Sequence, residues 1–191
     1  EQKLKINRDI RNLTNEMTGH GRDATIGLVY ESFYSLPGPG GDFRNPAGGK
    51  KAQEYQLRDD ETGDLLVLAY YGLDPDPADT VRAPIVRLIG YYRSVENESE
   101  NMGPVMTFDI DIPEVDQTKK IEQLIPSEAD SNNHDEVIEV AKGLADEHLF
   151  YNFRGRSVMI NAQIFHGNDA KRVTDTYNFT ITPRGPRGND D

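Results

Sequence analysis

Three strand-like segments follow one another near the carboxyl end of the chain, and they constrain the fold more than any other feature. They read LFYNFRG, SVMINAQIFHG and VTDTYNFTITP, beginning at Leu149, Ser157 and Val173. Only short polar connections separate them. Strands joined this closely run antiparallel, because a parallel pair needs a crossover of a dozen or more residues. The sequence therefore predicts an antiparallel sheet here.

Further strand patterns lie upstream of these three. They read LLVLAYYG from Leu65, IVRLIGYYRSV from Ile85 and PVMTFDIDIP from Pro104, and the last alternates apolar and polar residues. The run at 135–147 fits either a helix or a strand, and a central glycine favours the strand. We expect six or seven strands, with Thr62-Gly63 as the turn of a hairpin between 52–58 and 65–72.

The amino-terminal segment KLKINRDIRNLTNEM, residues 3–17, predicts an amphipathic helix. Its apolar residues are spaced four, three and four apart, as one stripe of a helix with 3.6 residues per turn requires. We expect this stripe to be buried; it consists of Ile6, Ile10, Leu13 and Met17. No capping residue precedes the first turn, which favours a helix that continues upstream of Glu1.

A weaker apolar pattern extends the helix through Gly19 and Gly21 to about Tyr34. We therefore expect an amphipathic stalk helix over 1–34, an antiparallel β head over 35–184 and a frayed tail over 185–191. Helix and head form one domain. The expected fold class is α+β, with the long N-terminal helix packed on a mainly antiparallel sheet.

Charge excludes two classes of partner. The 191-residue chain has 21 Lys and Arg against 33 Asp and Glu, a formal net charge of −12. A surface of this sign repels phosphate backbones and anionic head groups, so we expect neither nucleic-acid binding nor peripheral membrane binding. The chain has no cysteine, which excludes disulfides and thiolate chemistry. No stretch approaches the ~18 consecutive apolar residues of a membrane-spanning helix.

No catalytic motif emerges from the sequence. The four histidines show no H-x-x-x-H spacing and stand at positions 20, 134, 148 and 166. Asp109 and Asp111 lie on one side of an expected strand, where two carboxylates can act as acid and base. The regular alternation of that strand instead favours a solvated face. We therefore expect a protein that acts by interaction and not as an enzyme.

Two acidic loops are the candidates for calcium. The loops DDETGD and DPDPAD supply oxygen ligands of the kind calcium prefers. Neither follows the EF-hand spacing, so we expect solvated loops, no metal and no cofactor, and calcium remains the alternative. The candidate ligands are Asp59, Asp60, Asp64, Asp74, Asp76 and Asp79.

Segments at both ends resemble one protein family. KLKINRDIRNLTNEMTGHGRDA at the start, and LFYNFRGRSVMINAQIFHG followed by TDTYNFTITPRG at the end, are similar to type IV pilins and type II secretion minor pseudopilins of the J type. In that family a hydrophobic half-helix anchors the subunit in the inner membrane and packs the filament core. The following amphipathic half packs on a globular head. The resemblance implies a pilin-like fold with the anchoring half lying before Glu1.

The resemblance also implies a function. We expect a structural subunit of a bacterial type IV pilus or type II secretion pseudopilus, located in the cell envelope on its periplasmic or extracellular face. Its partners are other pilin-like subunits and the pilus or secretion machinery. A viral or phage structural subunit is the alternative. A small β-rich enzyme or ligand-binding domain ranks third.

Overall fold

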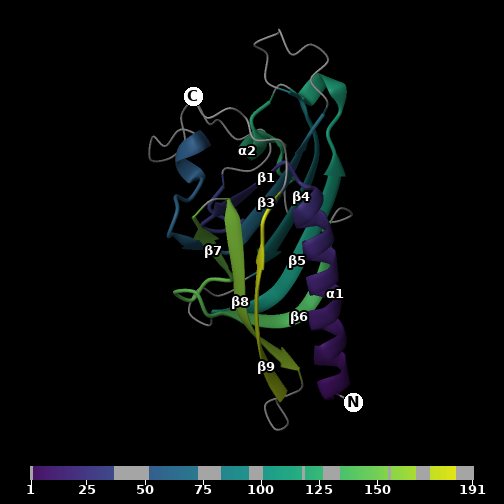
Figure 1. Cartoon of the computed structure of the whole chain (residues 1–191), viewed down its shortest axis with the longest axis vertical. Helices are drawn as coiled ribbons and strands as arrows, with labels where there is room; N and C mark the ends of the chain where they lie inside the picture. The colour runs from purple at the N-terminus through teal and green to yellow at the C-terminus, as the bar shows by residue number, and fades with distance from the viewer. Residues whose placement is uncertain are drawn as a thin grey trace.

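The computed structural model describes residues 2–36, 52–72, 83–94, 101–117, 119–126, 134–154, 156–166 and 173–183. Within them, the chain forms one long helix, a short helix, two 3-10 turns and nine strands (Figure 1). The helices are α1 (Gln2–Asp23) and α2 (Ile121–Leu124), and the 3-10 turns are η1 (Ala52–Tyr55) and η2 (Glu114–Asp116). The strands are β1 (Ile26–Tyr30), β2 (Thr62–Gly63), β3 (Leu65–Tyr71), β4 (Ile85–Arg93), β5 (Met102–Asp111), β6 (His134–Gly143), β7 (Phe150–Phe153), β8 (Ser157–His166) and β9 (Val173–Ile181).

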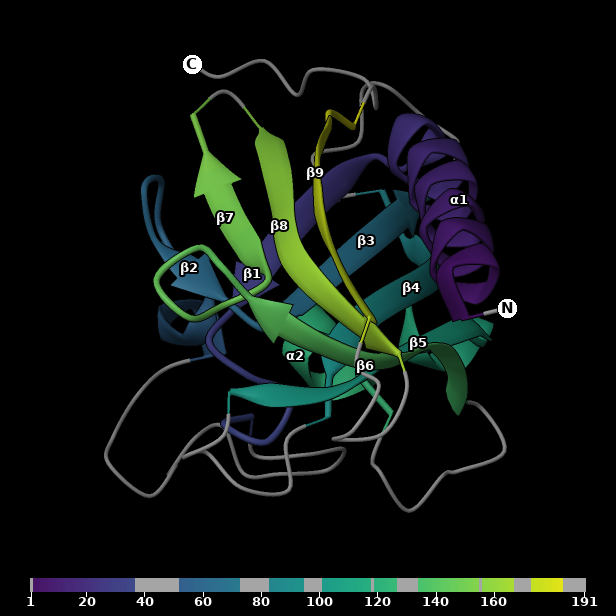
Figure 2. The same cartoon turned by 90° about the horizontal axis from the view of Figure 1, so that it is seen from below.

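The strands form a single antiparallel sheet. Their order is β1-β3-β4-β5-β6-β8-β7-β2, with β9 on the other side of β8. The sheet curls into a nearly closed barrel, and Figure 2 shows the strands arranged around a ring with α1 along one side. Among elements described, α1 contacts β9, β8, β6 and β3. The helix therefore covers the part of the barrel wall beside β9.

One continuous segment closes the barrel. Residues 62–63 form β2 and pair with β7, whereas residues 65–71 form β3 and pair with β1 and β4. Strand β2 is last in the strand order, and β3 lies next to β1, which is first. This segment therefore connects the two ends of the sheet. At the junction Gly63 lies against β1, where a Cβ atom would stand 2.0 Å from the carbonyl oxygen of Tyr30. Only glycine permits this close approach.

The junction residue Asp64 forms a buried ion pair with Arg93 at the end of β4. Their side chains are 8 % and 4 % exposed, and the Nη2 to Oδ2 distance is 2.5 Å. Arg93 Nε donates to Asp64 Oδ1, which also accepts the backbone N–H of Leu149. Arg93 Nη1 also donates to the Asn101 side-chain oxygen, and Nη2 donates to the Glu147 carbonyl. The pair is therefore buried and extensively hydrogen-bonded.

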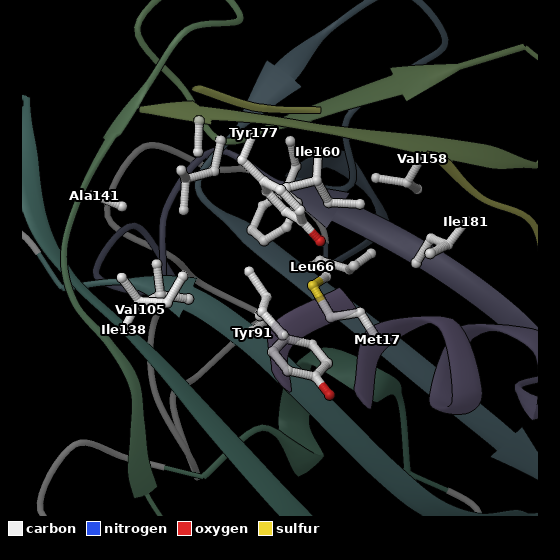
Figure 3. Packing of buried hydrophobic residues seen from close by; sticks show 14 of the residues in the cluster. Met17, Leu66, Tyr91, Val105, Ile138, Ala141, Val158, Ile160, Tyr177 and Ile181 are labelled. Carbon is white, nitrogen blue, oxygen red and sulfur yellow. The ribbon is translucent and has the colours of Figure 1, made fainter. Parts of the chain in front are cut away.

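Two hydrophobic cores lie on opposite faces of the sheet. The core on the α1 side contains Leu66 and Leu68 of β3, and Figure 3 shows Met17 of α1 pointing among strand residues such as Ile160 and Ile181. The second core lies on the other face of β1, β3, β4 and β5, where α2 covers it. Burial on both faces explains why β3 reads as a nearly continuous apolar run.

The α1 stripe lies in the first core. Ile6, Leu13 and Met17 are at most 3 % exposed, and Ile10 is partly buried against the same cluster. The strand interpretation of the C-terminal segments is confirmed by β7, β8 and β9. The interpretation of 135–147 as a strand is confirmed as far as Gly143, where β6 ends.

The expected helix over 1–34 is wrong, because α1 ends at Asp23 and 26–30 forms β1. In this segment β1 pairs along its whole length with β3, and Leu28 stands opposite Val67. The apolar pattern that suggested a continuing helix belongs to a strand whose alternate residues face the two cores: Val29 lies in the first, and Ile26 and Leu28 pack against the second. Long-range pairing therefore overrides the local helical pattern.

The pilin-like α+β fold class is also wrong. A long N-terminal helix does pack on a mainly antiparallel sheet, but that sheet forms a nearly closed, β-rich barrel. The cause is the segment around Thr62-Gly63. It was expected to be a hairpin turn, and instead it is strand β2, which reaches β7 and closes the ring.

Candidate functional site

Helix α1 presents a second line of residues opposite its buried stripe. Spacings that alternate between four and three residues keep positions on one side of a helix. Six residues with this spacing are all exposed and form what we call the outward ridge: Leu4, Arg8, Arg11, Asn15, Thr18 and Arg22. The ridge follows the spacing that helices use to pack along one another.

The ridge combines positive charge with an exposed apolar residue. Three of its six residues are arginines, none is acidic, and the Leu4 residue is 73 % exposed. Arg8 lies 3.4 Å from Asp9, and Arg22 lies 3.0 Å from Asp23. Both arginines are largely exposed in these pairs, and surface ion pairs of this kind contribute little free energy. The ridge is therefore a cationic surface on a protein of net charge −12.

A tyrosine of the barrel fixes the carboxyl-terminal half of α1. The Tyr91 hydroxyl of β4 donates to Glu16 Oε1 at 3.0 Å and lies 2.7 Å from His20 Nδ1. Since its single proton goes to Glu16, the hydroxyl accepts the Nδ1 proton of His20. Burial, and secondly the nearby Glu16 charge, raise the pKa of Tyr91. The hydroxyl stays protonated at neutral pH and joins two successive turns of α1 to the sheet.

Two further tyrosines hold the same helix. The Tyr177 hydroxyl of β9 lies 2.6 Å from Thr14 Oγ1, whose own proton goes to the Ile10 carbonyl. The Tyr70 hydroxyl of β3 donates to the His20 carbonyl at 2.7 Å. With Tyr91, these contacts attach α1 to three strands. The outward ridge is thus presented on a fixed support.

The tyrosine contacts predict a loss of stability at alkaline pH. Burial raises the pKa of Tyr70 and of Tyr177 to about 12. The unfolded chain releases these protons near pH ~10, so the stabilisation is complete below that pH and is lost as the pH rises toward 12. Urea unfolding across this range should show a falling free energy, and Tyr177→Phe should show a shallower fall. An identical pH dependence in Tyr177→Phe would contradict the assignment.

The described calcium candidates do not form a common site. Asp64 is engaged with Arg93, Asp60 accepts from Tyr151 and Arg154, and Asp59 is exposed. Within the parts of the chain that the structure describes, no group of three or more His, Cys, Asp or Glu residues is arranged to hold a metal ion. The other three candidates lie outside the described residues: Asp74, Asp76 and Asp79.

The sequence indicated the buried stripe but not the contacts that orient it. Glu16 and His20 stand one helical turn apart, a signal visible in the sequence, but their partner Tyr91 lies about seventy residues further along the chain. Glu, His and Tyr together can serve acid–base chemistry. Here the Tyr91 hydroxyl donates to Glu16 and lies beside His20, so the three side chains connect α1 to β4.

Comparisons with known proteins leave the family open. The chain matches no protein-family model, and searches of curated protein sequences and of solved structures give no significant match. Among the described helices, none is both long enough and apolar enough to cross a membrane.

Proposed function

We propose that the protein is a non-enzymatic structural subunit that acts by assembly, as minor pilins and pseudopilins do. The outward ridge of α1 is its contact with neighbouring subunits. One observation carries the proposal, namely that α1 keeps an exposed cationic ridge along its length while its opposite side is buried in the barrel. The barrel-like body gives no support of its own, because it differs from the expected pilin-like fold.

The chemistry of the ridge suits a protein partner. Arginine is enriched at protein interfaces, because its planar guanidinium makes several hydrogen bonds and its stem contributes apolar contact area. Arg8 and Arg11 are exposed on adjacent turns, and Leu4 continues the same line with an exposed apolar side chain. These residues supply both charge and apolar contact to a docking helix or strand.

Charge selects the kind of partner. A cationic ridge attracts an acidic surface, and complementary charge guides association and suppresses wrong partners. Other pilin-like subunits of acidic character fit this requirement, as do further copies of this chain, whose net charge is −12. Because that same net charge opposes self-association, copies in dilute solution should stay monomeric or associate weakly. The cell envelope is the site of assembly in this proposal.

Site-specific photo-cross-linking in the cells that naturally produce the protein tests the proposal. A benzophenone amino acid replaces Arg11 on the ridge, and in a matched variant it replaces Glu54, which is exposed on η1. We expect position 11 to yield a discrete adduct with an envelope protein whose own N-terminal segment is a long apolar helix.

Two results would overturn the proposal. One is the same adducts in the same yield from both positions, which indicates non-specific collisions. The other is a single adduct at position 11 with a soluble enzyme or a small-molecule-processing complex. Thermal unfolding of both variants must match the parent protein, so that the comparison reports contact and not folding.

A further inference from the structure

The outward faces of β8 and β9 form an uncharged hydrogen-bonding surface. Alternate residues of β9 are exposed, and the facing residues of β8 lie on the same side of the sheet. Asn161 stands opposite Asn178, and Gln163 stands opposite Thr176. We call this surface the β8–β9 face; it consists of Ser157, Met159, Asn161, Gln163, Thr174, Thr176, Asn178, Thr180 and Thr182.

The lack of charge is unusual for this chain. Charged residues make up 28 % of the sequence, yet none of the nine residues of the face is ionisable. Within the described residues β9 pairs only with β8, so it is an edge strand of the sheet. Edge strands are commonly protected by lysine or other charged side chains. Here threonine and asparagine occupy those positions instead, which keeps the surface open to a neutral partner.

The polar groups of the face are available to a ligand. Ser157 Oγ and Thr182 Oγ1 lie 2.9 Å apart and bond to each other. The side chains of Asn161, Gln163 and Asn178 make no hydrogen bond to any other described residue. Amides and hydroxyls both donate and accept, as the hydroxyl groups of sugars do.

Two aromatic rings adjoin this face on β7. Tyr151 pairs with Met159, and Phe153 pairs with Ser157, so both rings lie on the same side of the sheet. Their centroids are 5.9 Å apart, and Phe153 is 45 % exposed. An exposed ring offers a flat apolar surface on which the C–H groups of a sugar ring can stack.

We propose that the β8–β9 face, with Tyr151 and Phe153, binds a neutral polysaccharide. The chain's net charge of −12 repels an anionic ligand, and none of the nine residues is cationic, although Lys142 of β6 stands opposite Gln163 at the border of the face. A protein interface of ordinary size has an apolar core, whereas eight of the nine residues of the face carry hydroxyl or amide groups and Phe165, opposite Thr174, is buried. The face lies on strands and the outward ridge on α1, so the inference is independent of the proposed function.

Affinity electrophoresis of the full chain tests the inference. The gels contain hydroxyethylcellulose, dextran, galactomannan or, as the anionic comparison, alginate, and co-sedimentation with cellulose and chitin covers insoluble ligands. We expect retardation or co-sedimentation with at least one neutral polysaccharide and none with alginate. Thr176→Asp/Asn178→Asp should weaken that binding at least tenfold, because it places two charges within the face. Phe153→Ala should weaken it less.

A matched control adds the same charge elsewhere. Asn7→Asp/Asn12→Asp changes two exposed residues of α1 that lie outside both the ridge and the face. This variant should bind like the parent protein, and unfolding curves should show all variants folded. No binding to any neutral polysaccharide, stronger binding to alginate, or equal losses in both double variants would overturn the inference. Sedimentation supplies one further outcome that would overturn the inference. If copies of the parent chain associate and Thr176→Asp/Asn178→Asp abolishes that association, the face is a protein interface.

Discussion

Replacing Arg93 with methionine should lower the free energy of unfolding by about 3–5 kcal/mol, the largest effect we expect from a single substitution. The change leaves the Asp64 carboxylate buried without its partner at the point where the sheet closes. It also removes the donors to the Asn101 side chain and the Glu147 carbonyl. Urea unfolding at neutral pH, read by circular dichroism, measures the change.

A double variant separates the charge from the geometry of this pair. Asp64→Asn/Arg93→Met removes both charges and retains an amide oxygen that can accept the Leu149 N–H. It should be more stable than Arg93→Met, because no unpaired charge remains buried. The account of the junction is wrong if Arg93→Met costs less than about 1 kcal/mol, the typical value for an exposed ion pair.

The second large effect is a contrast between two glycines. Gly63→Ala should destabilise the protein by about 3 kcal/mol, at the upper end of overpacking effects, because the new methyl group meets the Tyr30 carbonyl at 2.0 Å. Gly19→Ala in α1 should stabilise it by about 0.5–1 kcal/mol. A Cβ at Gly19 meets nothing within 4 Å, and alanine favours the helix.

Chemical unfolding also measures the effects of the two glycine substitutions. Both variants are compared with the parent protein by chemical unfolding, and the midpoints should shift in opposite directions. If Gly63→Ala unfolds at the parent's midpoint, residues 62–63 do not lie tightly against β1, and the barrel is not closed at this point.

The individual helix and strands could be predicted from local sequence patterns, but the closure of the sheet into a barrel could not. The stripe from Ile6 to Met17 and the alternation within β5 each repeat several times within one short segment. They can therefore be recognised from the sequence of that segment alone. The pairing of β2 with β7 joins positions almost ninety residues apart. Nothing in two residues, Thr62 and Gly63, distinguishes a hairpin turn from a strand that bridges two ends of a sheet.

Part of the candidate site could also be predicted from local sequence patterns. A buried helical stripe implies an opposite exposed line, so Arg8 and Arg11 could be placed outside the core from the sequence. The tyrosines that orient α1 could not be identified, because Tyr91 and Tyr177 reach it from strands distant in the chain. The β8–β9 face depends on register as well. Asn161 stands opposite Asn178 only in the register in which β8 and β9 pair, and a shift of one residue would turn these side chains to the other face.

Fractionation of the cells that naturally produce the protein tests most directly whether the outward ridge holds it in an assembly. The parent protein is compared with Arg8→Glu/Arg11→Glu and with Lys119→Glu/Lys120→Glu, an equal charge change at two exposed residues next to α2. We expect the parent and the lysine variant to sediment with large envelope assemblies, and the arginine variant to be released as a folded monomer. Retention of the arginine variant in the assemblies at the parent's level would contradict the account.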